Sequence, residues 1–101
     1  MWLLVMFDLP VDTSENRKLA SGFRLSLLDY GFERSQFSVY LRFCEGKEQA
    51  ETWVRRVNVV LPPDGKVYCL FFTDKQYEQI IRFENKVRKR SKKNPSQFEL
   101  F

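Results

Sequence analysis

Asp8 is the residue whose type and position point most directly to chemistry. The sequence opens MWLLVMFDLP, so an apolar run from Trp2 to Phe7 stops at one carboxylate, and Pro10 closes the stretch. The chain has no histidine, which excludes Ser-His and Cys-His nucleophiles and the usual general base. Any catalysis must therefore use carboxylates, hydroxyls, Arg, Lys or a hard metal ion.

Two interpretations of Asp8 are open from its position alone. The side chain can form an Asx turn or cap a helix at Asp8-Leu9-Pro10, which needs no functional role. Alternatively, it can bind a cation or share a proton with a second carboxylate. The composition does not decide between these two roles.

The C-terminal segment carries the positive charge of the chain. Residues 85–101 hold six basic residues and one acidic residue, a net charge of +5, whereas residues 1–84 have a net charge of −1. Dense Lys and Arg release counterions from phosphates, so salt-sensitive nucleic-acid binding is one role, and a solubilising end is the other. The basic residues are Lys86, Arg88, Lys89, Arg90, Lys92 and Lys93. Three apolar residues after Pro95, namely Phe98, Leu100 and Phe101, suit strand addition to a partner's exposed edge.

The length of 101 residues and the apolar share of 44% favour one folded domain. We assign residues 1–84 to this domain and residues 85–101 to a basic tail with an apolar docking end. The opening apolar run is too short to span a bilayer or to form a signal-peptide core, so we expect a cytoplasmic protein with no membrane partner. Cys44 and Cys69 lack CxxC spacing, so we expect both to be small core hydrophobes.

Apolar spacing predicts the order of the secondary-structure elements. Continuous apolar runs predict strands at 2–9 and 66–73, and alternation predicts a strand within 32–43, with an additional short strand or hairpin around 31–36. Helical spacing predicts one helix from the capping residues 12–15 to Gly31 and a second from Gly46 to the Pro-Pro-Asp-Gly turn at 62–65. A single helical turn at 73–76 and a further strand at 79–83 follow.

This order is β-α-β-β-α-β with an extra C-terminal strand, and it predicts an α+β ferredoxin-like sandwich with two helices on one face of an antiparallel sheet. The strands at 2–7 and 67–72 are apolar on both faces, so something besides the helices must cover the second face. We expect a two-fold homodimer packed through its sheets. Asp8 would then lie near the Asp8 of its twin, and the two carboxylates would need a cation or a shared proton.

Other polar residues have ordinary structural explanations. In that interpretation four residues are solvated surface charges: Arg17, Lys18, Arg24 and Arg34. Ser38 and Tyr40 share the polar face of their strand with Arg42, where cross-strand packing is the usual explanation.

Three segments resemble the CRISPR-associated "Cas two" family, a core factor of spacer acquisition. They are the strand ending in Phe7-Asp8-Leu9-Pro10, the helix with Asn16-Arg17, and the run YGFERSQFSVY from Tyr30 to Tyr40. The resemblance covers roughly residues 1–84 and follows the predicted order of elements. A Tyr often precedes the family's aspartate, and Phe7 takes that place here, so any role for a phenol hydroxyl at this position is lost.

The resemblance implies a homodimer that bridges two dimers of the integrase "Cas one" and holds duplex prespacer DNA. It also implies, for some members, a metal-dependent nuclease in which Asp8 is the catalytic residue and binds magnesium or manganese. Phe37 and Ser38 would shape that site. The expected nucleic-acid-binding residues are Arg17, Arg34, Lys89, Arg90, Lys92 and Lys93, and the expected integrase-docking residues are Phe98, Leu100 and Phe101.

The leading functional hypothesis is a spacer-acquisition adaptor in CRISPR antiviral defence that dimerises and binds duplex DNA. The alternative is a magnesium-dependent endonuclease that cleaves RNA or DNA through Asp8 at the dimer axis, so whether the protein is an enzyme stays open. One carboxylate per subunit provides few ligands for a hydrolytic metal site, which favours the adaptor hypothesis. A regulatory domain that binds a metabolite is a third hypothesis, although the four isolated glycines form no phosphate loop.

Overall fold

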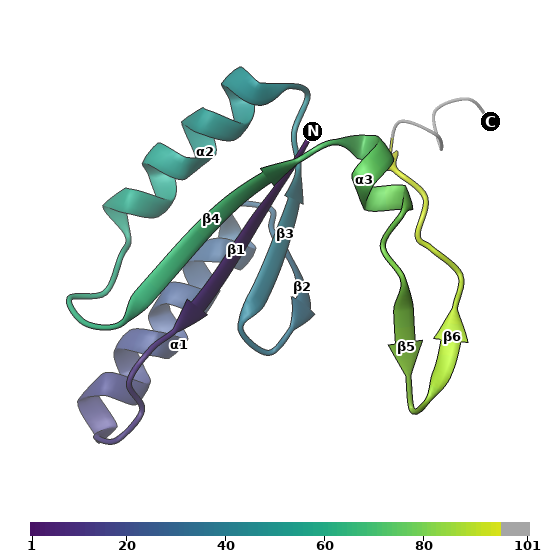
Figure 1. The fold of residues 1–101 in the computed structure, drawn as a ribbon. Helices are drawn as coiled ribbons and strands as arrows, with labels where there is room; N and C mark the ends of the chain where they lie inside the picture. The colour runs from purple at the N-terminus through teal and green to yellow at the C-terminus, as the bar shows by residue number, and fades with distance from the viewer. Residues whose placement is uncertain (96–101) are drawn as a thin grey trace.

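A four-stranded antiparallel sheet forms the centre of the molecule. The computed structural model describes residues 1–95. The strands are β1 (Trp2–Asp8), β2 (Glu33–Gln36), β3 (Val39–Phe43) and β4 (Lys66–Phe72), in the spatial order β2-β3-β1-β4. Two helices, α1 (Ser14–Asp29) and α2 (Lys47–Val59), connect them, and α1 lies behind the sheet in Figure 1. The predicted α+β class is confirmed, and the arrangement is consistent with a ferredoxin-like sandwich.

Local signals explain where the first helix begins and ends. The Thr13 hydroxyl accepts a hydrogen bond of 3.0 Å from the backbone N–H of Asn16, which caps the N-terminus of α1. Gly31 follows the helix with a φ of +86°, a conformation that glycine adopts without steric cost. The predicted stop at Gly31 is confirmed.

The core lies between the sheet and the two helices. Leu3, Val5 and Phe7 alternate along β1 and face the helices, because successive residues of a strand point to opposite faces. They pack against the buried helix residues Ala20, Phe23, Leu27, Ala50 and Val57. These helix residues belong to the apolar stripes that the helical spacing indicated.

Tyr40 lies in this core, and its interpretation as part of a polar strand face was wrong. It pairs with Val5 in the register of β1 and β3, which turns its side chain toward the helices. Arg42 lies on the same side, and its Nε donates a 2.8 Å hydrogen bond to the carbonyl of Tyr30. The Arg42 guanidinium also lies 4.1 Å from the centroid of the Trp53 ring. The Arg42 side chain on this face of β3 therefore contacts the end of α1 and Trp53 of α2.

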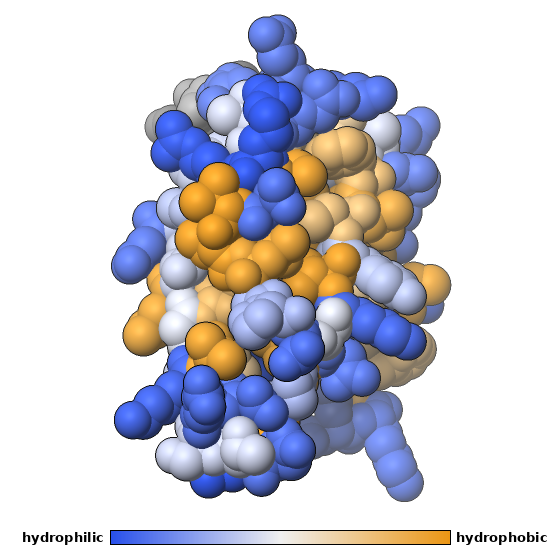
Figure 2. All heavy atoms as spheres, turned by 90° about the vertical axis from the view of Figure 1, so that its left-hand side faces the viewer, coloured by the Kyte–Doolittle hydropathy of each residue, from blue (hydrophilic) through white to orange (hydrophobic). Residues whose placement is uncertain are grey.

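The other side of the sheet has no helix over most of its area. We call this side the open face and define it by Leu4, Met6 and Asp8 of β1 and Tyr68 and Leu70 of β4, which are paired or neighbouring positions in the register. Met6, Tyr68 and Leu70 are exposed. Figure 2 shows another side of the molecule, where hydrophobic side chains also gather across the middle and hydrophilic ones lie at both ends. Exposed apolar surface on this scale is typical of an interaction site.

A short helix and a hairpin follow β4. Helix α3 (Asp74–Glu78) begins with a capping box between Thr73 and Gln76. Strands β5 (Arg82–Glu84) and β6 (Val87–Lys89) then pair with each other as a separate two-stranded sheet. The extra C-terminal strand predicted from the sequence is thus half of a hairpin beside the main sheet (Figure 1). The division predicted at residue 84 falls between these two strands.

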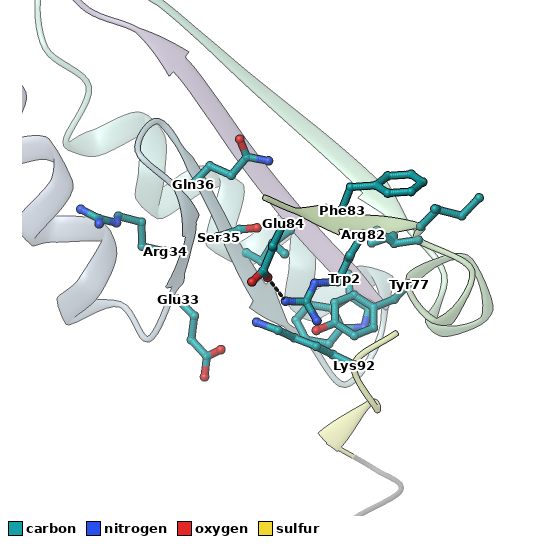
Figure 3. Close-up of a pocket in the computed structure, with 13 residues that line it drawn as sticks. Trp2, Glu33, Arg34, Ser35, Gln36, Tyr77, Arg82, Phe83, Glu84 and Lys92 are labelled. Atoms are coloured by element: carbon teal, nitrogen blue, oxygen red, sulfur yellow. Dashed lines mark hydrogen bonds and ion pairs between the residues drawn. The ribbon is translucent and has the colours of Figure 1, made fainter. Parts of the chain in front are cut away.

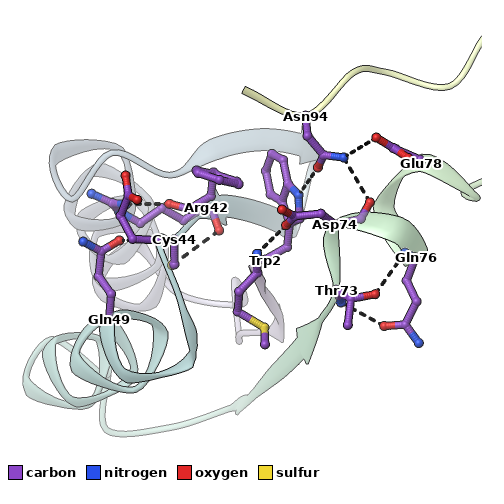
Figure 4. A network of polar contacts seen from close by, with 12 residues as sticks. Trp2, Arg42, Cys44, Gln49, Thr73, Asp74, Gln76, Glu78 and Asn94 are labelled. Atoms are coloured by element: carbon purple, nitrogen blue, oxygen red, sulfur yellow. Dashed lines mark hydrogen bonds and ion pairs between the residues drawn. The ribbon is translucent and has the colours of Figure 1, made fainter. Parts of the chain in front are cut away.

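Polar contacts and stacked rings connect α3 and Asn94, which follows the hairpin, to the start of β1. The Trp2 indole N–H donates a 2.6 Å hydrogen bond to Oδ1 of the buried Asn94 (Figure 4). The ring of Tyr77 stacks on Trp2, with the ring centroids 3.9 Å apart. The N-terminal amine forms an ion pair with Asp74. Helix α3 therefore covers the Trp2 end of the open face, and the Asp8 end remains uncovered.

The cysteines divide between the core and the surface. Cys44 is buried, as predicted, and the pKa of its thiol is raised because burial disfavours the thiolate. Cys69 is exposed on β4, which is an edge strand, so its assignment to the core was wrong. Within residues 1–95, no helix is long and apolar enough to cross a membrane.

Candidate nucleic-acid interface

Asp8 lies at the end of β1, on the open face. It pairs with Lys66 of β4, and both side chains are exposed. Leu4, Met6 and Asp8 alternate on one side of the strand, so the carboxylate continues the apolar row of the open face. Among residues 1–95, no ion pair involves Asp8. The carboxylate is therefore available at the uncovered end of the sheet.

A shallow hollow of about 340 Å³ brings Asp8 and Ser38 together. The backbone N–H of Phe7 donates a 3.1 Å hydrogen bond to the carbonyl of Ser38, which fixes the β2–β3 turn beside the end of β1. Met6, Lys66 and Tyr68 also line the hollow. The structure thus brings the predicted site residues Asp8 and Ser38 to the same hollow. It adds the ammonium group of Lys66 and the phenol of Tyr68, which the motif did not include.

One subunit alone offers a poor ligand set for a metal ion. The residues that the structure describes contain no group of three or more Cys, Asp or Glu side chains placed to hold a metal. Magnesium is commonly held in enzymes by one or two carboxylates together with substrate phosphates and water. Asp8 fits that pattern as one ligand, and among the described residues it is the one carboxylate that lines the hollow.

Arg17 of α1 forms a hydrogen bond with the loop after β1. Its Nη1 donates a 3.0 Å hydrogen bond to the carbonyl of Val11, while the residue itself stays exposed. Asn16 likewise donates a 2.8 Å hydrogen bond to Oδ1 of Asp12. Arg17 therefore has a structural role, and its exposed guanidinium lies on the loop that follows Asp8.

Phe37 and two arginines form a second group at the β2–β3 turn. The guanidinium carbon of Arg24 lies 4.4 Å from the centroid of the Phe37 ring, and that of Arg34 lies 6.0 Å from it. The interpretation of Arg24 as a solvated surface charge was wrong, because it is half-buried between rings. In Figure 3, the Arg34 side chain points away from the hairpin.

The predicted basic residues of the tail lie on and after the hairpin. Lys89 of β6 pairs with Arg82 of β5. Lys89 and the following Arg90 and Lys92 are exposed. Lys92 and Arg34 both line a pocket of about 620 Å³ between the hairpin and the edge of the sheet (Figure 3). Lys93 is exposed beside the buried Asn94. The basic segment is thus positioned by a folded hairpin as far as residue 95.

Three predicted residues, Phe98, Leu100 and Phe101, lie outside the described residues. Three residues that the sequence motif did not single out as site residues do contribute to the site: Arg24, Lys66 and Tyr68. Lys66 and Tyr68 could have been found from the register of β4 against β1, since they lie opposite Asp8 and Met6. Nothing in the local sequence around Arg24 signals its contact with Phe37.

Gly65 should be required for the backbone around Asp8. It has a φ of +100°, and a Cβ at this position would lie 2.8 Å from the Asp8 carbonyl and 2.7 Å from the side chain of Leu9. Gly65→Ala should therefore lower the free energy of unfolding by about 2 kcal/mol. Urea denaturation followed by circular dichroism, at one protein concentration, measures this change.

The matched control is Gly22→Ala in α1, where a Cβ meets no atom within 4 Å. This substitution should raise stability by up to about 1 kcal/mol, because alanine favours a helix interior over glycine. Equal effects of the two substitutions would contradict the close approach at Asp8.

Comparison with known proteins identifies the family. A family model described as CRISPR associated protein Cas2, the "Cas two" family, matches residues 1–80. A protein of Paracidovorax avenae is 55% identical over all 101 residues, which cover 94% of that relative, and one of Flavobacterium psychrophilum is 45% identical, with 88% covered. A third, of Parvibaculum lavamentivorans, is 44% identical, with both chains covered in full. Each relative is named CRISPR-associated endoribonuclease Cas2. The first strand ending in an exposed aspartate, the helix-covered antiparallel sheet and these matches together show that the chain belongs to the Cas2 family.

Proposed function

We propose that the protein is a dimeric adaptor of CRISPR spacer acquisition that binds duplex prespacer DNA and bridges two dimers of the integrase "Cas one". The observation that carries this proposal is the open face, on which Met6, Tyr68 and Leu70 are exposed. A second copy packed on this face would bury those side chains about a two-fold axis. The same packing would give the assembly two equivalent basic hairpins, which suits a pseudo-symmetric duplex.

The basic residues suit phosphate contacts that carry little sequence information. Lys89, Arg90 and Lys92 are exposed in a short stretch, and Arg17 and Arg34 are exposed on the body. Arg and Lys contacts to phosphate fix the position of a duplex without reading its bases. Duplex binding of this kind agrees with an architectural role. We assign Phe98, Leu100 and Phe101 to docking on the integrase, as an apolar end after the basic stretch.

Replacing Lys89, Arg90, Lys92 and Lys93 together by Ala should weaken duplex binding and make it less sensitive to salt. Each lost phosphate contact lowers the slope of log affinity against log salt by about 0.9, so the slope should fall by up to about 3.6. Fluorescence anisotropy with a labelled duplex, from low to moderate salt, measures both quantities. Unchanged affinity and slope would remove these residues from the DNA interface.

A chain that ends at Asn94 is the control, because it keeps the four basic residues and the Asn94 contact with Trp2. It should bind duplex as the full chain does and lose capture of the integrase in a pull-down. Retained capture would contradict the docking role of the last residues.

A metal-dependent endonuclease is the second candidate function, and two observations favour it. The relatives are named endoribonucleases, and Asp8 is exposed in a hollow beside Ser38. In a dimer packed through the open face, Asp8 of each subunit would hold magnesium or manganese, with RNA as the favoured substrate and DNA as the alternative. The ion would supply an activated water and stabilise charge on the phosphate. Arg17 and Arg34 would contribute positive charge near the substrate.

A further inference from the structure

The exposed ring of Phe37 is unusual because a guanidinium already packs against it. Phe37 lies in the turn between β2 and β3 and is 67% exposed. The Arg24 guanidinium carbon is 4.4 Å from its centroid and that of Arg34 is 6.0 Å away, both within the range of cation–π contacts. An exposed aromatic side chain beside two cations has little in common with an apolar docking patch.

The core holds Arg24 in this position. Its guanidinium also lies 5.5 Å from the ring of Phe7, which in turn packs edge-on against Phe23 at 5.1 Å. Within the described residues, the buried Nε of Arg24 has no hydrogen-bond partner. Rings rather than hydrogen bonds therefore fix the guanidinium, and the stack Phe23, Phe7, Arg24, Phe37 runs from the core to the surface. These contacts hold the Phe37 ring in place without a ligand, and we call this ring the platform.

We propose that Phe37 stacks against an unpaired base of a single-stranded segment, while Arg24 and Arg34 bind the adjoining phosphates. Every base has a planar π face, and stacking on aromatic side chains beside cations is the general mode of single-strand binding. The two guanidiniums match the charge of a nucleic-acid backbone, which a neutral apolar partner would not offer. This inference rests on the proposed nucleic-acid-binding function and adds an unpaired base to it.

The platform lies near Asp8, so a base stacked on Phe37 could position a strand at the candidate site. Ser38 directly follows Phe37 and lines the hollow that contains Asp8. A nucleotide stacked on Phe37 would therefore keep the neighbouring backbone close to this hollow. The platform can hold a single-stranded end of a bound duplex or an unpaired stretch of RNA in that place.

Phe37→Ala should weaken binding of a labelled single-stranded oligonucleotide by roughly 5- to 150-fold, the range measured when one stacking side chain is removed. Phe37→Leu should behave like Ala, because it keeps an apolar side chain without a π face. Phe37→Trp should bind at least as tightly as the wild type, and its fluorescence should be quenched when the oligonucleotide binds. Parallel titrations with DNA and with RNA show which of them supplies the base.

Three controls separate stacking from other effects. Leu25→Ala changes a side chain of α1 that is 61% exposed and next to Arg24, and it should leave affinity unchanged. A series of oligonucleotides, each with an abasic residue at a different position, should identify the base that stacks on Phe37. At that position, Phe37→Ala should cause no further loss of affinity. A blunt duplex should bind Phe37→Ala and the wild type equally.

The stacking role is overturned if Phe37→Ala binds single strands as tightly as the wild type, or if the wild type does not bind them at low salt. It is also overturned if the substitution weakens blunt duplex and single strand alike, because that result indicates a general role in folding or phosphate contact. Each of these results can occur while the four tail residues still govern duplex binding. Failure of the proposed function instead appears as the absence of duplex binding by the wild type.

Discussion

Asp8→Asn is expected to lower metal-dependent cleavage of RNA by at least about 100-fold. The amide keeps the size of the side chain and loses the charge that a magnesium or manganese ion requires. Asp8 is exposed at the end of β1 and forms no ion pair within residues 1–95, so the substitution should leave folding unchanged. Cleavage of labelled RNA by rigorously purified protein, with and without magnesium, measures the effect.

Asp64→Asn is the matched control, since Asp64 is also exposed and lies in the turn before β4. It should retain cleavage within twofold of the wild type. Binding of manganese, followed by water-proton relaxation, gives a readout that does not depend on activity and should weaken only in Asp8→Asn. Cleavage that persists in Asp8→Asn would assign the activity to another residue or to a contaminant, while the adaptor function would stand.

Much of the fold could be predicted because its signals are local. The apolar run of β1, the cap at Thr13 and the stop at Gly31 each act within a few residues. Tyr40 was misplaced because the face of a strand is set by its partners. Tyr40 pairs with Val5 of β1 and so faces the helices, and the alternation of residue types does not show which face of a strand the helices cover.

The candidate site was predictable only in part for the same reason. Asp8 stands out because one carboxylate ends an apolar run, and Ser38 was reached through the family motif. The contact of Arg24 with Phe37 depends on the packing of a helix residue against a distant turn, so no local pattern reveals it. The exposure of Cys69 depends on the position of β4 at the sheet edge, which composition does not specify. Sequence patterns identified candidate residues, whereas the tertiary structure determines which of them meet.

The open face gives the other prediction with a large effect. Leu70 is 53% exposed in β4, opposite Leu4 of β1. If a second copy covers this face, Leu70→Arg buries an unpaired charge against an apolar surface. The dissociation constant of the dimer should then rise by at least about 100-fold. Analytical ultracentrifugation over a range of concentrations measures it, and the circular dichroism spectrum should remain that of the folded chain.

Val59→Arg is the control, because Val59 is 81% exposed at the end of α2 and lies outside the open face. It should leave the dimer intact. A wild-type chain that stays monomeric at high concentration, or a Leu70→Arg chain that still dimerises, would contradict packing through the open face.

The same variant tests whether the two Asp8 carboxylates act together. Leu70→Arg leaves Asp8 unchanged in each subunit but removes the surface that would bring the pair together. If two carboxylates hold one ion, monomeric Leu70→Arg should lose RNA cleavage to the same extent as Asp8→Asn, and Val59→Arg should keep it. If the monomer cleaves RNA normally, one Asp8 is sufficient, and the open face then serves assembly rather than chemistry.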